Sequence, residues 1–132
     1  MIVITGGAGF IGSAMIARLN ETGEEKLIIV DNPGNSDKWK NLRTKKFLEF
    51  YNKNDFLNTI DDTRRGKSRL NKISAIIHMG ACSDTTEQDM DYLYQTNYRY
   101  SISLLHFALK NKIRFIYASS AAVYGDGKNG FN

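Results

Sequence analysis

The sequence contains a single cysteine, Cys82, which excludes an intramolecular disulfide bond and is compatible with a reducing cytoplasm. No apolar run approaches the ~20 residues that a membrane-spanning helix needs. Met1 leads directly into an apolar stretch that lacks a basic segment and a small-residue cleavage site, so no signal peptide is predicted. Repeats, low-complexity tracts and metal-ligand spacings are also absent. These absences predict a soluble cytoplasmic protein with no membrane partner.

The composition is that of one ordinary globular domain. The 132 residues include 42% hydrophobic and 24% charged residues, which excludes a disordered chain and a fibrous repeat. Eighteen lysines and arginines against fourteen acidic residues give a net charge of +4. Most of this excess lies in Lys38 to Lys46 and Arg64 to Lys72. A basic face could bind a phosphate-bearing ligand or RNA, although such runs are more often solvated loops.

Apolar runs alternate with segments of helical periodicity, which is typical of an α/β protein with a parallel sheet. Ile2 to Thr5, for example, is a short and largely β-branched run, as expected of a strand buried on both faces. His78 ends another such strand and is expected to be a hydrogen-bonded core residue. We expect strands at residues 2–5, 26–30, 46–51, 73–78 and 113–118, and helices at 10–20, 55–61 and 88–111.

The longest predicted helix follows Thr86 and Asp89, which make a plausible capping pair. Acidic residues near its start and lysines near its end complement the helix dipole. Helical spacing assigns to its inner face the residues Met90, Leu93, Tyr94, Asn97, Tyr98, Ile102, Leu105 and Leu109.

A glycine-rich turn lies between the first predicted strand and the first predicted helix. Gly7 and Gly9 with Gly12 form the G-x-G-x-x-G pattern, which also reads as Gly6-x-x-Gly9-x-x-Gly12. Glycines permit the tight turn, the approach of a pyrophosphate to the backbone and close packing of the helix on the sheet. Asp31 ends the second strand about twenty residues further on, as the fingerprint requires. A purely structural turn is the alternative, and the context favours a dinucleotide site in a doubly wound parallel sheet of the Rossmann type.

The residues alone leave the phosphorylation state of the dinucleotide open. Asp31 would accept hydrogen bonds from the adenosine ribose hydroxyls, which favours NAD. Lys38 and Lys53 could instead hold the 2′-phosphate of NADP, or they could be plain surface lysines.

Two further segments follow predicted strands and would point into the same crevice as the glycine turn. They are Met79 to Ser83 and Ser119 to Gly125. Together with the glycine turn, they resemble the extended short-chain dehydrogenase/reductase superfamily, which includes nucleotide-sugar epimerases and dehydratases. Within it, Gly80 to Ser83 followed by Thr85-Thr86-Glu87 is most similar to the ADP-L-glycero-D-manno-heptose 6-epimerases of lipopolysaccharide core biosynthesis.

The resemblance implies an epimerase that interconverts the two C6 epimers of ADP-heptose by transient oxidation and re-reduction. It favours NADP over NAD, because Lys38 and Lys53 match cofactor-binding lysines of the heptose epimerases. It also implies a homo-oligomer, a pentamer in that family, and no nucleic-acid partner. The other cofactor-binding residues that it implies are Gly6, Gly9, Phe10, Ile11, Gly12, Asp31, Asn32, Met79, Gly80, Ala81, Cys82, Ser83 and Asn97.

Ser120 matches the catalytic serine, whose hydroxyl can hydrogen-bond a substrate oxygen as it becomes a carbonyl. The superfamily's base, a tyrosine with a lysine four residues later on a helix, would lie beyond Asn132, as would the substrate domain. Tyr124 and Lys128 have the right spacing, but the glycines around them disfavour a helical turn. We therefore expect residues 1–132 to be an incomplete Rossmann domain, truncated after about the fifth strand, that binds cofactor without catalysis.

Two alternatives remain open from the sequence. One is a UDP- or dTDP-sugar epimerase or dehydratase of the same superfamily. The other is a non-enzymatic module that senses NADP(H) or binds RNA through Arg64 to Lys72.

Overall fold

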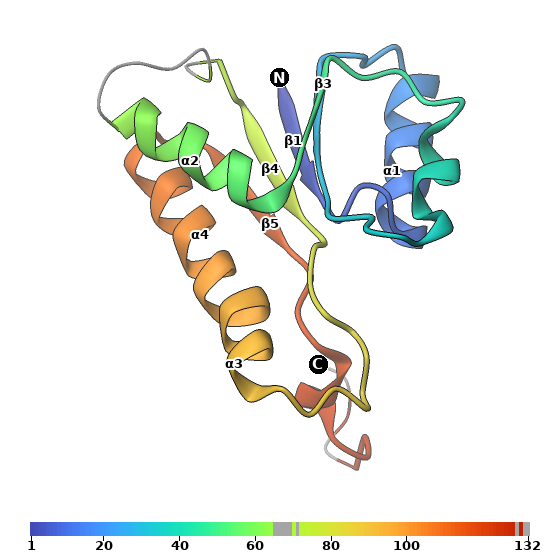
Figure 1. Ribbon diagram of the computed structural model, residues 1–132, viewed down its shortest axis with the longest axis vertical. Helices are drawn as coiled ribbons and strands as arrows, with labels where there is room; N and C mark the ends of the chain where they lie inside the picture. Colours follow the sequence, from blue (N-terminus) through green and yellow to red (C-terminus); the bar gives the residue numbers. More distant parts are fainter. Residues whose placement is uncertain (65–69, 71, 129, 131–132) are drawn as a thin grey trace.

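The computed structural model describes residues 1–64, 70, 72–128 and 130 and is built on one five-stranded parallel sheet (Figure 1). The strand order is β3-β2-β1-β4-β5, so that β1 lies at the centre. Its neighbours pair in register, Ile2 with Leu27 of β2 and with Ala75 of β4. The strands are β1 (Ile2–Thr5), β2 (Leu27–Val30), β3 (Glu49–Tyr51), β4 (Ala75–His78) and β5 (Arg114–Tyr117).

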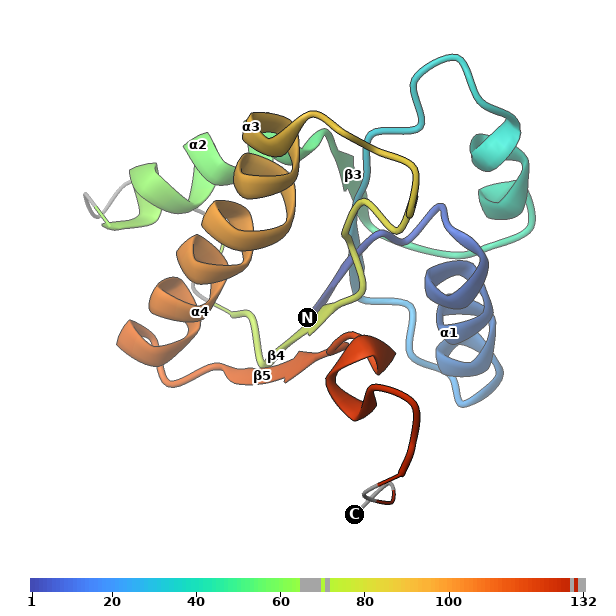
Figure 2. The ribbon, with the colours of Figure 1, turned by 90° about the horizontal axis from the view of Figure 1, so that it is seen from below.

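Helices cover both faces of the sheet. One face carries α1 (Phe10–Glu21), and the other carries α2 (Lys53–Arg64) beside a long helix, residues 90–110 (Figures 1 and 2). The long helix joins α3 (Met90–Leu93), a π-helical stretch η2 (Tyr94–Arg99) and α4 (Tyr100–Lys110). Among the described residues, no helix has both the length and the apolar character to cross a bilayer. This arrangement is the predicted doubly wound sheet.

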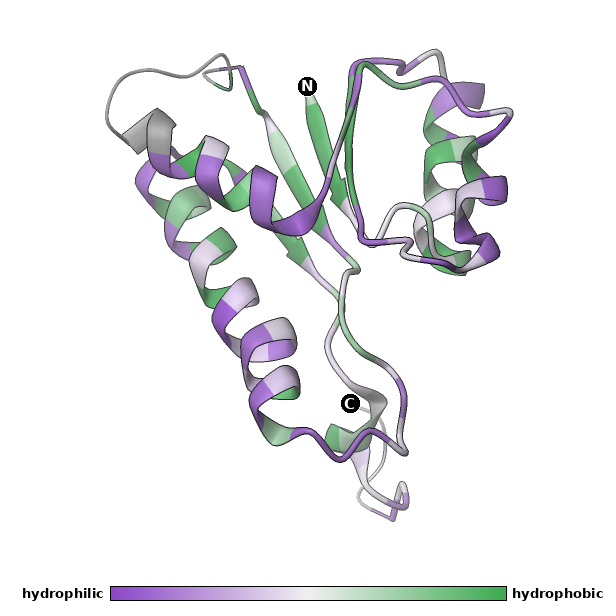
Figure 3. Ribbon diagram, in the orientation of Figure 1, coloured by the Kyte–Doolittle hydropathy of each residue, from purple (hydrophilic) through white to green (hydrophobic). Residues whose placement is uncertain are grey.

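The apolar runs of β1, β2 and β4 are buried on both faces because their side chains alternate between two cores, whereas the edge strands β3 and β5 are largely exposed. Ile4 and Ile29 pack with Ile16 of α1 on one side. Val3 and Ile28 pack on the other side with a larger cluster from α2 and α4, in which Phe56, Ile60, Leu104 and Phe107 are fully buried. In Figure 3 the strands are accordingly hydrophobic, whereas the helices alternate hydrophobic with hydrophilic positions.

All five predicted strands are present, and the largest differences in length from the prediction are at β3 and α2. Strand β3 is limited to Glu49–Tyr51, and α2 extends over Lys53–Arg64 in place of residues 55–61. Of the basic run Arg64 to Lys72, residues 65–69 and 71 lie outside the described residues. The segment after β5 forms a short 3-10 helix, η3 (Ala121–Tyr124).

The predicted inner face and capping pair of the long helix are wrong. Met90 and Leu109 of that face are 71% and 67% exposed, and the buried stripe of α4 is Tyr100, Leu104, Phe107 and Ala108. The physical reason is that two neighbouring apolar stripes run along this helix at the same spacing, and the sheet buries the one that carries Tyr100, Leu104 and Phe107. At its start Asp89 alone is the N-cap, accepting from the Tyr92 N–H, whereas Thr86 bonds to Asp84.

His78 links β1, β4 and the long helix through one hydrogen-bonded chain. The Thr5 hydroxyl oxygen accepts a hydrogen bond from the Gly80 N–H, and the Thr5 hydroxyl in turn donates its own proton to His78 Nδ1. His78 Nε2 then donates to the Ser101 hydroxyl (2.7 Å), which in turn donates to the Asn97 carbonyl (2.6 Å). Only the Nε2–H tautomer satisfies every member of this chain. His78 is thus the hydrogen-bonded core histidine that the sequence predicts.

Because burial lowers the pKa of His78 to about 4, the protein should lose stability in acid. In the unfolded chain the pKa is near 6.5, so the unfolded state binds a proton first as the pH falls. The free energy of unfolding should decrease by about 2 kcal/mol between pH 7 and pH 5, as measured by chemical denaturation.

A His78→Asn variant should show less of this decrease. His106→Asn, at an exposed position of α4, is the matched control and should keep it. Identical pH profiles for the wild type and His78→Asn would contradict the assignment.

Candidate functional site

A cavity of about 500 Å³ opens at the carboxyl ends of the strands, where the chain order reverses on either side of β1. The glycine turn, the ends of β2 and β4, and the long helix form its walls (Figure 2). Of the residues predicted from the sequence, those that line it are Gly6, Gly9, Phe10, Ile11, Gly12, Asp31, Asn32, Lys38, Lys53, Met79, Gly80, Ala81 and Ser83.

Two glycines allow the backbone segments of this site to touch. A Cβ on Gly12 would lie 2.2 Å from the Gly6 carbonyl oxygen, so the start of α1 packs directly on the turn. Gly6 has φ +68°, and a Cβ there would lie 2.8 Å from Gly80. The turn after β1 therefore meets the segment after β4 with no side chain between them.

The start of α1 offers a site for an anion. Its N-cap is Gly9, which has no side chain to cap the helix, so the first N–H groups of the helix have no protein side-chain partner there. The helix dipole adds partial positive charge at this end. Phe10 and Ile11 stand 89% and 61% exposed beside it. This geometry suits a pyrophosphate, which would contact the backbone and cover the two apolar side chains.

Asp31 and Asn41 hold the glycine turn from both sides. One oxygen of Asp31 accepts from the Ala8 N–H (2.8 Å) and the other from the Asn32 N–H (2.7 Å). The amide of Asn41 donates to the Ala8 carbonyl (2.9 Å). Asn41 belongs to the 3-10 helix η1 (Asp37–Leu42), and sequence reasoning missed it because the surrounding polar stretch has no periodic signal.

Lys53 and Lys38 line the cavity together with Asp31. The N–H of Lys53 donates to the side-chain oxygen of Asn32 (2.8 Å), which fixes the start of α2. Its ammonium donates to the Thr96 hydroxyl (3.2 Å) and lies 5.3 Å from the ring centroid of Tyr100. Partial burial lowers the pKa of Lys53.

Asn97 and Cys82 do not line the cavity, and they are hydrogen-bonded to each other. The Asn97 side-chain oxygen accepts from the Cys82 N–H (2.7 Å), and its amide donates to the Cys82 carbonyl (2.9 Å). This bidentate contact fixes the loop after β4, whose residues Met79 to Ala81 face the cavity. The direct cofactor contacts expected of Asn97 and Cys82 stay predictions.

Ser120 lies at the carboxyl edge of the sheet, after β5, and it too is outside the cavity lining. Its hydroxyl accepts from the Ala122 N–H (3.2 Å) and caps η3. The hydroxyl proton remains able to donate to a ligand. Over the part of the chain that the structure describes, no cluster of His, Cys, Asp and Glu could hold a metal ion.

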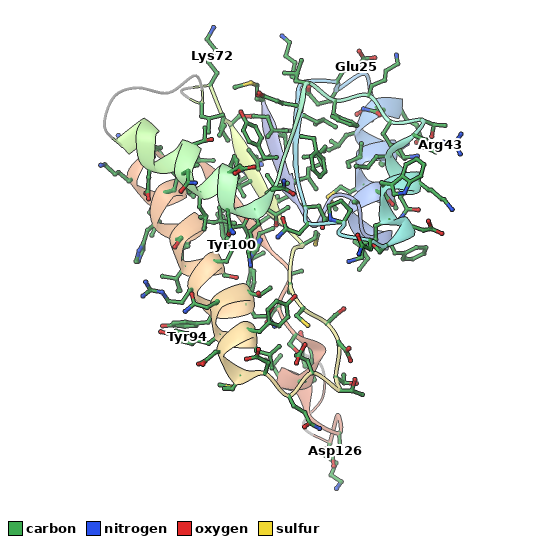
Figure 4. The ribbon with its side chains drawn as sticks, viewed as in Figure 1. Glu25, Arg43, Lys72, Tyr94, Tyr100 and Asp126 are labelled. Atoms are coloured by element: carbon green, nitrogen blue, oxygen red, sulfur yellow. The ribbon has the colours of Figure 1, made fainter. Side chains whose placement is uncertain are left out.

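Three cavity residues of the long helix were missed by the sequence reasoning: Tyr92, Thr96 and Tyr100. Thr96 and Tyr100 are four residues apart, a spacing that could have paired them. The apolar stripe chosen from the sequence placed them off the inner face, whereas the structure turns the neighbouring stripe toward the sheet. In Figure 4 Tyr100 lies between the long helix and the sheet, whereas Tyr94 points away on the outer side.

Replacing Gly12 with alanine should disrupt the glycine turn, because the added methyl meets backbone rather than a movable side chain. We expect a loss of about 2 kcal/mol in the free energy of unfolding, measured by denaturant titration, together with weaker dinucleotide binding. Gly9→Ala is the comparison, since its Cβ meets only the Gly6 carbonyl oxygen at 3.1 Å. An equal loss of unfolding free energy in Gly12→Ala and Gly9→Ala would show that the close backbone contact at Gly12 does not cause the destabilisation.

The sequence matches the model of the NAD dependent epimerase/dehydratase family over residues 2–131. An ADP-L-glycero-D-manno-heptose-6-epimerase of Brachyspira hyodysenteriae is 48% identical over 131 residues, which are 99% of this chain and 40% of that protein. The corresponding enzyme of Nitratidesulfovibrio vulgaris is 46% identical over 132 residues, with the same 40% coverage. The chain thus spans about 40% of the length of these curated relatives.

Solved structures of related enzymes have the same fold. The ADP-L-glycero-D-manno-heptose-6-epimerase of Helicobacter pylori superposes with a TM-score of 0.74 at 36% identity, over 96% of this chain and 41% of that one. A UDP-galactose 4-epimerase superposes with a TM-score of 0.70 at 26% identity, over 96% and 40%. With the family's sequence pattern, fold and glycine turn all present, the chain belongs to the NAD dependent epimerase/dehydratase family.

Proposed function

We propose that this chain is the cofactor-binding part of an ADP-L-glycero-D-manno-heptose 6-epimerase that uses NADP. The observation that carries the proposal is the cavity in which the uncapped start of α1, Asp31 and two lysines meet. The curated relatives named above support the heptose substrate, as does the Gly80 to Ser83 segment that resembles theirs. The proposed setting is cytoplasmic synthesis of the lipopolysaccharide core by a homo-oligomer.

The choice of NADP rests on charge. Asp31 alone would favour a ribose with two free hydroxyls, because a phosphate beside a carboxylate is repelled. Lys38 and Lys53 supply two positive charges to the same cavity, and Lys53 has no carboxylate partner among the described residues. These lysines offset Asp31 and make a 2′-phosphate the better occupant.

In the proposed reaction, bound NADP supplies the acceptor and donor of the hydride at C6 of the heptose. The N–H groups at the start of α1 hold the pyrophosphate, and Asp31 with Asn32 orients the adenosine ribose. Met79 to Ala81 line the nicotinamide half. Ser120 donates a hydrogen bond to the sugar oxygen, which stabilises it as the carbonyl forms.

The proton acceptor for that step is not proposed within residues 1–132. Tyr124 lies in η3, and Gly125 and Gly127 follow it with φ of +56° and +74°, conformations that end a helix. Lys128 pairs with Asp126 (2.6 Å). Tyr124 and Lys128 are therefore not one helical turn apart. We propose that the tyrosine–lysine base and the substrate domain belong to further chain, a proposal supported by the greater length of the curated relatives.

A UDP-sugar epimerase is the second candidate, favoured by the structural likeness to UDP-galactose 4-epimerase. The RNA-binding alternative has no supporting observation, since most of Arg64 to Lys72 lies outside the described residues.

The 132-residue chain, with its mass of 14.9 kDa verified, should bind NADP but should not turn over ADP-heptose. Binding is measured by calorimetry and turnover by chromatography of the two epimers. Turnover by the verified chain would contradict the proposed location of the base. Epimerisation of UDP-galactose but not ADP-heptose by a longer chain that contains it would favour the second candidate.

Removing the lysine charges should weaken NADP binding selectively. Lys38→Met and Lys53→Met keep the apolar stems, and each should lower NADP affinity by roughly tenfold while changing NAD affinity little. Lys46→Met is the control, because Lys46 pairs with Glu25 and does not line the cavity. Equal losses for NADP and NAD would contradict the assignment of a 2′-phosphate.

A further inference from the structure

The hydroxyl of Tyr100 is a buried polar group without a partner. Tyr100 is 3% exposed, it lines the cavity, and its oxygen has no hydrogen bond to the described residues. Its polar neighbours are satisfied: Thr96 bonds to Lys53, and His78 bonds to Ser101. Buried hydroxyls are nearly always paired, so an unpaired one on a residue that lines a cavity indicates a ligand atom that completes it.

The charges around Tyr100 define what that atom is. The ammonium of Lys53 lies over the Tyr100 ring, and the Thr96 hydroxyl to which it donates is uncharged. Burial and the nearby Asp31 raise the pKa of Tyr100, so its hydroxyl stays protonated and can donate. Asp31 already accepts from Ala8 and Asn32. Two donors thus face the same cavity, and they call for an acceptor-rich, negatively charged group.

We propose that the Tyr100 hydroxyl donates a hydrogen bond to the 2′-phosphate that Lys53 holds, so that Tyr100 is a specificity-determining residue for NADP. The inference rests on the proposed dinucleotide site and adds to it a residue that neither the sequence nor the family resemblance supplied.

The position of the pair selects the 2′-phosphate over the pyrophosphate. Lys53 follows β3 and is tied through its N–H to Asn32, next to Asp31 at the adenosine side of the sheet. The pyrophosphate belongs at the start of α1, beside Gly9. NAD carries the pyrophosphate but not the 2′-phosphate, so a comparison of the two nucleotides separates these sources.

The test is a Tyr100→Phe variant, which keeps the ring under Lys53 and removes only the hydroxyl. NADP affinity should fall roughly tenfold in calorimetry, and NAD affinity should stay the same. Tyr98→Phe is the matched control, on the same helix but exposed and outside the cavity. Equal losses for both nucleotides, or no loss for either, would overturn the proposal. Failure of the wild type to bind either nucleotide would instead overturn the proposed function.

A second readout distinguishes this role from a structural one. Without nucleotide, Tyr100→Phe should raise the midpoint of thermal unfolding, because it removes an unpaired buried hydroxyl. The rise in midpoint that saturating NADP causes should be smaller in Tyr100→Phe than in the wild type. A fall in midpoint without nucleotide would mean that the hydroxyl is already satisfied, which contradicts the proposal.

Coupling to Lys53 gives a third readout. Because both groups contact one phosphate, the double variant Lys53→Met, Tyr100→Phe should lose less NADP affinity than the sum of the single losses. Strict additivity would contradict a shared phosphate.

Discussion

The backbone contact between the turn after β1 and the segment after β4 is the constraint on which the site depends. A Cβ on Gly6 would lie only 2.8 Å from Gly80, a Cβ on Gly80 would lie 3.0 Å from the Gly6 nitrogen, and Gly12 brings the first turn of α1 onto the same spot. Any side chain there would push the helix start away from the strand ends. The uncapped N–H groups at the start of α1 would then no longer face the wall formed by Met79 and Gly80.

Polar contacts outside the cavity reinforce this arrangement. Asp31 and Asn41 fix the peptide of Ala8 from opposite sides, and Asn97 fixes the loop at Cys82. His78 joins β1 and β4 to the long helix through neutral hydrogen bonds. Hydrogen-bonded pairs thus fix the walls of the site. By contrast, Lys38 and Lys53, the cations that line the cavity, have no carboxylate partner among the described residues. Rigid walls with unpaired donors suit selective binding of an anion.

The sequence predicted the elements whose signal is local. Short apolar runs such as Ile2 to Thr5 predicted all five strands, and strand ends predicted the cavity residues from Gly6 to Ser83, because parallel strands place their carboxyl ends together. Tyr100 was missed because a neighbouring stripe of apolar residues on the same helix, with the same spacing, was taken as the inner face. Asn41 was missed because its contact with Ala8 joins two loops, and no pattern within either loop encodes it.

The π-helical stretch also affects how this chain is compared with others. A helix that contains one wide turn holds an extra residue between its two ends, so it is equivalent to a regular helix with a single-residue insertion. An ungapped alignment to a homologue with a regular helix would match Tyr100 or Asn97 to its true counterpart, but not both. A one-residue gap placed between Asn97 and Tyr100 restores both equivalences, and a deletion there would change the register without shortening either flanking helix.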